Sequence, residues 1–339
     1  MTDSIRHIYR WDLDKTYLRT DFDTIRDLVR TALQRPEDKV NVPGVVTLLK
    51  ELTHHTDDGR AYLTFISGSP TQMRTKLEAK FALDGIEPDV FILKPTLQNI
   101  LKGRFRAIRG QVGYKLDNLL KVRHEGPVAG ETLFGDDAEQ DAFIYSLYAD
   151  LAAGLIDRDL LFAILDEAGV YAPTRASILE RFQSMRKDAN VGRIFIHLDR
   201  HTAPGRFLVF GPRVVPITNY FQAALVLFAD GVLDVEPVYR VAAGMIRNHG
   251  YGIPQLANSF QDLLRRRHLG RDVVDRLATA AATDALPSGL ADEFLIRVRA
   301  LAPRQSRPTT AWEGPPDYLA VLKADQKLRE KIDPEPGLF

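Results

Sequence analysis

The chain has 339 residues, of which 45% are hydrophobic and 27% are charged, as in a globular protein with a substantial core. Lysine plus arginine and aspartate plus glutamate number 45 each, so the net charge of zero excludes a strong overall attraction to nucleic acid or to an anionic membrane. There is no cysteine, which excludes disulfides and thiolate chemistry. The N-terminal residues lack the pattern of a secretion signal, and no apolar run reaches the ~18 residues of a membrane span, so we expect a cytoplasmic protein.

Short apolar runs alternate with helical patterns over the first 200 residues. This alternation predicts an α/β fold, a three-layer sandwich with a mostly parallel sheet between helices. Strands are expected at 7–11, 61–66, 89–93, 131–135 and 192–198, with a further strand-like run at 206–210. Helices are expected at 42–52, 70–83 and 141–154, together with a charged helical pair at about 157–186.

The character of the sequence changes after about residue 210. We predict a core at 1–210 that carries a helical insertion at about 155–190. Residues 211–305 show helical segments separated by glycine or proline and no strand alternation, so we expect a helical region there. The remainder, 306–339, is rich in proline and predicts an extended tail with one short charged helix at about 317–331.

Polar residues that suit phosphoryl chemistry follow three of the expected strands. They are Asp12, Asp14 and Thr16 after 7–11, Ser67 and Gly68 after 61–66, and Asp136 and Asp137 after 131–135. Ligands of an open parallel sheet bind outside the carboxyl ends of its strands, so we expect these side chains to meet at one edge. Each motif alone is a common turn or helix cap, and it is the shared placement that indicates a catalytic site.

The chemistry of each residue type suggests its role. Asp12, the first residue after its strand, could attack phosphorus, and Asp14 could protonate the leaving alcohol and then activate water. A carboxylate repels a phosphate dianion, so a cation is needed between them, and Mg²⁺ prefers oxygen ligands. Asp12, the backbone carbonyl of Asp14, and Asp136 or Asp137 would supply those ligands.

The second motif and a lysine complete the predicted set. In "SGSPTQ", Ser69 with Pro70 predicts a capped helix N-terminus beside Ser67, where the Ser67 hydroxyl and the amides near Gly68 could hold phosphoryl oxygens. Lys115 is expected at the start of a helix, where its ammonium could neutralise an aspartyl-phosphate. The predicted phosphate-binding residues are Thr16, Ser67, Gly68 and Lys115.

These four elements resemble the motifs of phosphatases in the haloacid dehalogenase superfamily. "DLDKT" resembles the first motif, Ser67 the second, Lys115 the third and "GDD" the fourth. The resemblance implies a nucleophile at Asp12, an acid and base at Asp14, a phosphate ligand at Ser67 and a magnesium ligand at Asp136. It also implies Asp137 and Asp141 as further ligands or supporting groups.

A closer resemblance is to the catalytic domains of the actin-patch-associated, lipin-like phosphatidate phosphatases. "SGSPTQ" and "GDDAEQDAFIY" carry it, over roughly residues 7–200, although Thr71 stands where those proteins have tryptophan. The spacing between motifs leaves no room for a large cap, which implies an open site. We therefore expect a Mg²⁺-dependent phosphomonoester hydrolase that works through an aspartyl-phosphate, with phosphatidate as one candidate substrate.

Two alternatives stay open. One is a phosphatase of a soluble metabolite, a phosphoprotein or a nucleic-acid end, and the other is a binding or scaffold protein on the same fold. A lipid substrate would bring the protein into peripheral contact with a membrane, and no nucleic-acid partner is expected. Lys102, Arg104, Arg106 and Arg109 could contact such a surface, although a solvated face is the commoner role of a basic run.

Overall fold

A parallel sheet forms the centre of the protein. The computed structural model describes residues 4–20, 35–56, 58–94, 104–187, 190–281, 290–301, 307–309 and 312–332, with the backbone alone at 104–109, 280–281, 290–291, 301 and 328–332. Six strands pair in parallel in the order β3-β2-β1-β4-β5-β6. They are β1 (Ile5–Trp11), β2 (Arg60–Pro70), β3 (Val90–Lys94), β4 (Gly130–Asp136), β5 (Val191–His197) and β6 (Val214–Ile217). The predicted α/β class with a parallel sheet is confirmed.

The order of the strands fixes where a ligand can bind. From β1 the chain moves outward to β2 and β3, and then returns to the other side of β1 with β4. Open α/β sheets bind ligands outside the carboxyl ends of their strands at such a reversal, which here lies between β1 and β4. Asp12 follows β1 directly and Asp136 ends β4, so both residues lie at this reversal.

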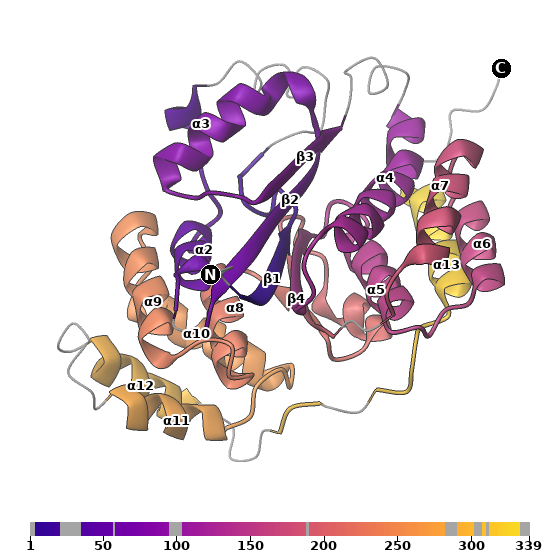
Figure 1. Ribbon diagram of the computed structural model, residues 1–339. Coiled ribbons are helices and arrows are strands. Elements are labelled where there is room, and N and C mark those ends of the chain that lie inside the picture. The colour runs from indigo at the N-terminus through magenta and orange to yellow at the C-terminus, as the bar shows by residue number, and fades with distance from the viewer. Residues whose placement is uncertain are drawn as a thin grey trace.

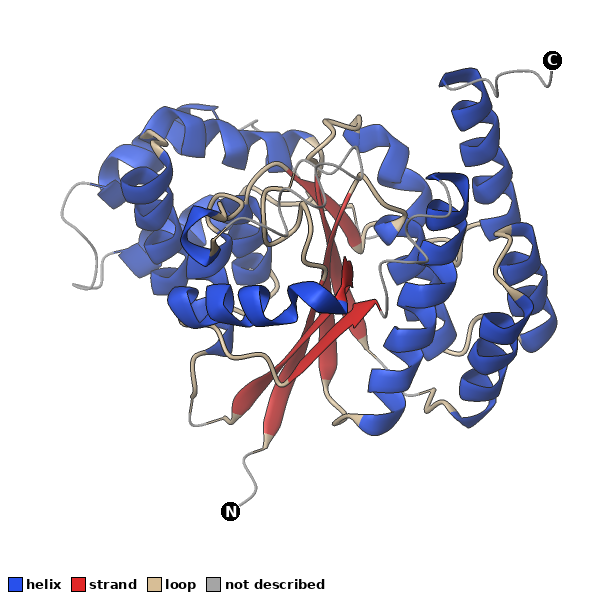
Figure 2. Ribbon diagram, turned by 90° about the horizontal axis from the view of Figure 1, so that it is seen from above, coloured by secondary structure: helices blue, strands red, loops and turns tan. Residues whose placement is uncertain are grey.

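Helices cover both faces of the sheet, as Figures 1 and 2 show. One layer contains α2 (Val45–Thr53), α3 (Arg74–Asp84), α8 (Tyr220–Ala229), α9 (Val235–His249), α10 (Ile253–Arg265), α11 (Asp272–Ala281) and α12 (Leu290–Leu301). The other contains α4 (Arg104–Glu125), α5 (Asp141–Ala152), α6 (Arg158–Glu167), α7 (Ala172–Ser184) and α13 (Tyr318–Ile332). Alternate strand residues supply the two cores, so that Phe65 and Phe134 face the first layer while Ile66 and Leu133 face the second.

Two predictions about the region around residue 210 are wrong: the strand expected at 206–210, and the expectation that 211–305 contains helices alone. The run at 206–210 is part of a 3₁₀ helix, η4 (Pro204–Phe210), in which Leu208 is 74% exposed. The strand lies further on, at β6, where it pairs with β5 alone and forms the edge of the sheet. Pro216 falls inside β6, and this position is permitted because an edge strand does not need every backbone N–H for pairing.

The helices otherwise follow the sequence pattern. The expected pair at 157–186 is α6 and α7, and the expected short helix of the tail is α13. Shorter 3₁₀ helices are η1 (Pro36–Asp38) and η2 (Thr71–Met73).

The proposed boundary at 210, between the core and the helical region, falls between the strands β5 and β6 of one sheet. Across it, the Tyr220 ring of α8 lies 5.3 Å from the Trp11 ring. Lys115 lies in the middle of α4, which corrects the expectation that it begins a helix.

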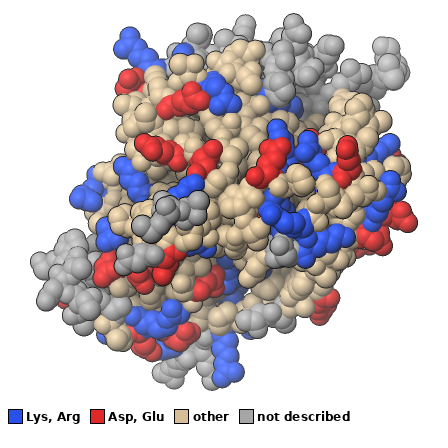
Figure 3. All heavy atoms as spheres, viewed as in Figure 1, with Lys and Arg blue, Asp and Glu red and all other residues tan. Residues whose placement is uncertain are grey.

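The surface carries charges of both signs. On the face in Figure 3, Lys and Arg side chains are interspersed with Asp and Glu. The side chains of the basic run at 102–109 lie outside the described part of the structure. Within that part, none of the helices has the length and apolar character to cross a bilayer.

Candidate active site

Asp12 lies at the carboxyl end of β1, beside β4. Its backbone N–H donates to the Phe134 carbonyl at 2.9 Å, so the last ladder contact of β1 fixes the position of this carboxylate. The residue is only 1% exposed. Thr16 Oγ1 lies 3.5 Å from Asp12 Oδ2, at the outer limit of a hydrogen bond. The turn of the first motif therefore packs its threonine against its first aspartate.

Lys115 is fully buried and binds three carboxylates. Its Nζ lies 2.9 Å from Asp12 Oδ1, 2.5 Å from Asp141 Oδ1 and 2.6 Å from Glu139 Oε2. The attraction of these groups outweighs burial, so the pKa of Lys115 is raised well above its ordinary value. One buried cation among several carboxylates leaves the cluster with an excess of negative charge.

Asp14 joins the first motif to the second. Its Oδ2 accepts hydrogen bonds from Ser67 Oγ at 3.1 Å and from Ser69 Oγ at 2.7 Å. Burial raises the pKa of Asp14, although the two serine hydroxyls favour its ionised form. The serine of "SGSP" that was expected to cap a helix therefore binds Asp14 instead, and η2 begins without a side-chain cap.

A residue of α4 also fixes the position of the second motif, "SGSPTQ". Tyr114 donates its hydroxyl to the Ser67 carbonyl at 3.0 Å, and Ser67 Oγ accepts the N–H of Ser69 at 2.9 Å. A Cβ at Gly68 would lie 2.8 Å from the amide nitrogen of Gln111. A side chain at position 68 would therefore require the Gln111 side chain to move.

Asp136 has a carboxylate oxygen with no protein partner. Its Oδ1 accepts the backbone N–H groups of Ala138 at 2.5 Å and Glu139 at 3.0 Å. Its Oδ2 is buried and has no hydrogen-bond partner among the described residues. Burial, together with the charges of Asp141 and Glu139, raises the pKa of Asp136 well above its usual range. A buried, unsatisfied carboxylate oxygen is costly, and a divalent cation would satisfy it.

The carboxylates around Lys115 form a second group that could hold a metal ion. Asp12, Glu139 and Asp141 each offer an oxygen, and these oxygens lie within 4.8 Å of one another, a spacing that could hold a metal ion. All three carboxylates also contact Lys115, whose ammonium already offsets part of their negative charge. Asp136 Oδ2, which has no protein partner among the described residues, could also hold a cation.

Asp137 and Asp141 serve different structural purposes. Asp137 accepts backbone N–H groups of the loop after β5, from Arg200 at 2.8 Å and from Thr202 at 2.9 Å, so both of its oxygens are engaged there. Asp141 Oδ2 accepts the N–H of Asp136 at 3.2 Å. A Cβ at Gly135 would lie 2.4 Å from this oxygen, so only glycine fits before Asp136.

Several residues near the site have no counterpart in the sequence prediction. Glu139 binds Lys115 and also accepts a hydrogen bond from Gln111 at 2.8 Å. Lys39 is 4% exposed, and burial lowers its pKa while the nearby charge of Asp14 raises it. Lys94, whose Nζ lies 5.4 Å from the centre of the Tyr114 ring, ends β3, so the strand-end rule could have identified it. No motif marks Lys39, and Glu139 lies inside "GDDAEQDAFIY" without a role assigned to it from the sequence.

Comparison with known proteins gives one match. No curated protein and no solved structure matches the chain. Residues 11–158 match the family described as phosphatidate phosphatase APP1, catalytic domain. The matched segment contains Asp12, Asp14, Ser67, Lys115 and Asp136. Over this segment the chain is similar to a phosphatidate phosphatase catalytic domain, which supports a phosphatase.

Proposed function

We propose that the protein is a Mg²⁺-dependent phosphomonoester hydrolase of the haloacid dehalogenase type, acting through an aspartyl-phosphate on Asp12. One observation carries the proposal, namely that side chains from separate elements meet at the carboxyl edge of the sheet. Lys115 contacts Asp12 at 2.9 Å, and Ser67 contacts Asp14 at 3.1 Å. The match of residues 11–158 to a phosphatase family supports the same reaction class.

Asp12 is the proposed nucleophile. A carboxylate oxygen of Asp12 forms a bond to phosphorus while the bond from phosphorus to the alcohol oxygen breaks. Water then attacks the same phosphorus, which releases inorganic phosphate and restores the carboxylate. Burial raises the pKa of Asp12 and Lys115 opposes this effect, so a second nearby cation would further favour the ionised nucleophile.

Asp14 is the proposed acid and base. In the first step it gives its proton to the departing alkoxide, and in the second it takes a proton from the attacking water. The raised pKa of Asp14 suits the first of these roles, because the carboxyl must carry a proton when the alcohol leaves. Ser67 and Ser69 hold the carboxyl in place by binding one of its oxygens.

Asp12, the backbone carbonyl of Asp14, and Asp136 would hold the Mg²⁺ ion. The unsatisfied Oδ2 of Asp136 supports this set. When bound, the ion supplies positive charge that offsets repulsion between the carboxylates and the substrate phosphate. Asp137, the other predicted ligand, is given a structural role here because both of its oxygens bind backbone N–H groups.

Thr16, Ser67, Gly68 and Lys115 form the proposed phosphate-binding set. Lys115 neutralises the charge of the aspartyl-phosphate, and the amides near Gly68 donate to phosphoryl oxygens. The Ser67 hydroxyl donates to Asp14 in the free protein and turns to a phosphoryl oxygen when substrate binds, while Ser69 keeps its bond to Asp14. Among lipids, phosphatidate is the first substrate to test, and it would require peripheral contact with a membrane. Soluble phosphomonoesters, phosphoproteins and nucleic-acid ends remain the alternatives within the enzyme class.

The test is hydrolysis of p-nitrophenyl phosphate with Mg²⁺ and with a chelator. We expect turnover in the wild type with Mg²⁺ only, and none in Asp12→Asn. Asp166→Asn is the matched control, because Asp166 pairs with Arg175 on the surface. Turnover by Asp12→Asn equal to that of the wild type would refute the proposal, and failure of the wild type on every phosphomonoester would favour the scaffold alternative.

A further inference from the structure

The turn of the first motif has an uncommon backbone conformation. Lys15, which lies between Asp14 and Thr16, has a φ of 61°. This left-handed region is unfavourable for a residue with a Cβ, so it persists only where neighbouring contacts hold it. The Lys15 N–H donates to the Leu18 carbonyl at 2.7 Å, inside the turn. A trans peptide is planar with its C=O opposite its N–H, so the Asp14 carbonyl points out of the turn.

His197 holds the carbonyl of Lys15. It is the last residue of β5, where it pairs with Asp136 in the ladder, and its side chain is buried. Its Nδ1 lies 2.7 Å from the Lys15 carbonyl oxygen, and because a carbonyl can only accept, Nδ1 donates. The Lys15 ammonium lies 3.4 Å from the carboxylate of Asp199, which follows β5. The end of β5 therefore contacts both the backbone and the side chain of Lys15.

Tyr220 holds the next carbonyl of the same turn. It begins α8, is fully buried, and donates its hydroxyl to the Thr16 carbonyl at 2.8 Å. Its ring stacks on the His197 ring, with the ring centres 6.2 Å apart and the planes inclined by 19°. Two neighbouring rings, one from β5 and one from α8, thus bind successive carbonyls of the first motif.

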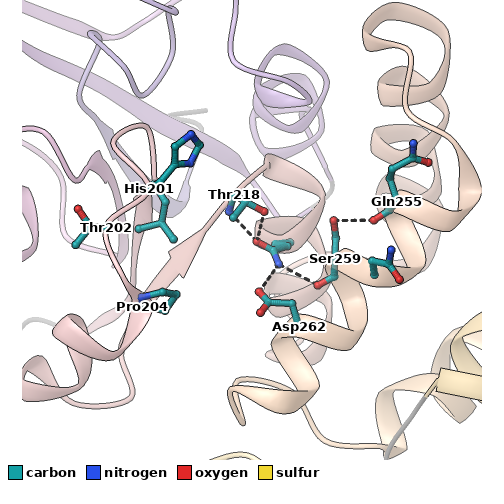
Figure 4. Close-up of a pocket in the computed structure, with 10 residues that line it drawn as sticks. His201, Thr202, Pro204, Thr218, Gln255, Ser259 and Asp262 are labelled. Carbon is teal, nitrogen blue, oxygen red and sulfur yellow. Dashed lines mark hydrogen bonds between the residues drawn. The ribbon is translucent and has the colours of Figure 1, made fainter.

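The start of α8 is itself anchored, which fixes the position of Tyr220. Gln222 is fully buried, and its amide oxygen accepts the Thr218 N–H at 2.8 Å and the Thr218 hydroxyl at 3.2 Å. Its amide nitrogen donates to the Ser259 carbonyl at 2.9 Å and to Asp262 at 3.0 Å, both on α10 (Figure 4). All four hydrogen-bonding positions of this side chain are used. The Tyr220 hydroxyl therefore reaches the first motif from a helix that is tied to α10.

Neither ring belongs to the segment that matches the phosphatase family. That segment ends at residue 158, before β5 and α8 begin. It contains Lys115, Ser67 and Ser69, which hold the carboxylates of the first motif. His197 and Tyr220 hold backbone carbonyls of that motif instead, so the later part of the chain also contributes to the candidate site.

We propose that His197 and Tyr220 are positioning residues, which hold the Asp14 carbonyl outside the turn, where it can bind Mg²⁺. The inference rests on the proposed function, in which that carbonyl is a ligand, and it adds two residues from outside the matched segment. Without these bonds, Lys15 can leave its left-handed conformation, and a change of φ at Lys15 rotates the peptide that carries the Asp14 carbonyl. The affinity for Mg²⁺ would then fall.

The experiment removes each donor and keeps its ring. Tyr220→Phe lacks the hydroxyl, and His197→Phe lacks Nδ1 but keeps a ring against Tyr220. Calorimetric titration with Mg²⁺ measures affinity without substrate, and p-nitrophenyl phosphate measures turnover. We expect each variant to raise the Kd for Mg²⁺, and the Mg²⁺ concentration for half-maximal rate, by about tenfold. His197→Asn should recover most of the lost affinity, because its amide nitrogen can donate in place of Nδ1.

Tyr318→Phe is the matched control for loss of a buried hydroxyl. Tyr318 is buried and its hydroxyl binds Asp150, at the other end of α5 from Asp141. This variant should lose stability to urea as Tyr220→Phe does, and should keep the wild-type Kd for Mg²⁺. Wild-type affinity for Mg²⁺ in both Tyr220→Phe and His197→Phe, whatever their stability, would overturn the inference and leave the proposed function intact.

The wild type separates this inference from the proposed function. If it binds Mg²⁺ but hydrolyses no p-nitrophenyl phosphate, the proposed reaction is in question, and the Mg²⁺ titrations of the variants alone decide the positioning role. If it neither binds Mg²⁺ nor hydrolyses p-nitrophenyl phosphate, the proposed function is overturned and this inference with it.

Discussion

The Lys115 ammonium lies 2.9 Å from the Asp12 carboxylate, and both groups are buried. The same ammonium also binds Asp141 and Glu139, while Asp136 keeps one oxygen without a protein partner. Negative charge therefore exceeds positive charge in a region sheltered from water. Burial, together with the neighbouring carboxylates, raises the pKa values of Asp12 and Asp136, and a divalent cation is expected to offset the excess negative charge.

Replacement of Lys115 by methionine should remove both stability and activity. Without the ammonium, the buried carboxylates of Asp12 and Asp141 have no counter-charge, which should cost roughly 3–5 kcal/mol in free energy of unfolding at neutral pH. Turnover should fall by at least about 100-fold, because a charge that stabilises the transition state is lost. Urea unfolding and phosphatase assays of Lys115→Met check this, with exposed Lys50→Met as the control. Unchanged stability of Lys115→Met would contradict the charge arrangement.

Asp14→Asn should impair chemistry more than binding. The amide keeps the shape of the carboxyl but cannot transfer a proton, so kcat should fall by about 10²- to 10⁴-fold with little change in KM. Ser69→Ala should have a much smaller effect, because Ser67 still donates to Asp14 at 3.1 Å. Steady-state kinetics on one aryl phosphate measure both variants. A loss in Ser69→Ala as large as that in Asp14→Asn would show that Asp14 mainly supports structure.

Asp136 and Asp137 should differ in their dependence on metal. Asp136→Asn should raise the Mg²⁺ concentration for half-maximal rate by at least about tenfold, because a ligand is weakened. Asp137→Asn should leave that concentration unchanged, because both oxygens of Asp137 bind the loop at Arg200 and Thr202. Magnesium titrations of the two variants decide between the residues. A larger shift in Asp137→Asn would mean that the assignments must be exchanged.

The sequence predicted the central strands and most of the candidate site, because both depend on local patterns. Asp12, Ser67 and Asp136 each follow or end an apolar run, and parallel strands bring such positions to one edge. The strand β6 is not predicted from the sequence because it has only four residues and contains Pro216. The apolar run at 206–210 has the residue types of a strand but forms a 3₁₀ helix. The partners of Lys115 depend on the orientation of α4 about its own axis relative to the loop after β4. That orientation is set by packing, so Glu139 could not be found from spacing alone.

His7 should make stability fall in mild acid. Burial lowers its pKa to about 4, from an ordinary value of 6.5, so the unfolded chain binds this proton first as pH falls. The free energy of unfolding should therefore decrease as pH falls from 6.5 towards 4, and the contribution of His7 at pH 5 should be roughly 2 kcal/mol. Urea unfolding at pH 7.5 and pH 5 measures the change.

The variant His7→Gln isolates this contribution. Glutamine can keep a hydrogen bond to Thr132, which His7 makes at 2.9 Å, but it does not titrate. The variant should lose less stability between the two pH values than the wild type, while His124→Gln, on the exposed end of α4, should behave as the wild type. Equal losses in His7→Gln and the wild type would show that His7 is not the titrating group.

The most direct test of the central claim is a search for phosphate on Asp12. The variant Asp14→Asn, which should hydrolyse the intermediate slowly, is mixed with p-nitrophenyl phosphate carrying ³²P, whose leaving group departs without a proton from Asp14, and is quenched in acid. Peptide mapping should then find label on the peptide that contains Asp12, sensitive to hydroxylamine, and no label when Asp12→Asn is added to the same variant. Label on another residue, or turnover in the wild type with no labelled protein in Asp14→Asn, would contradict a nucleophilic Asp12.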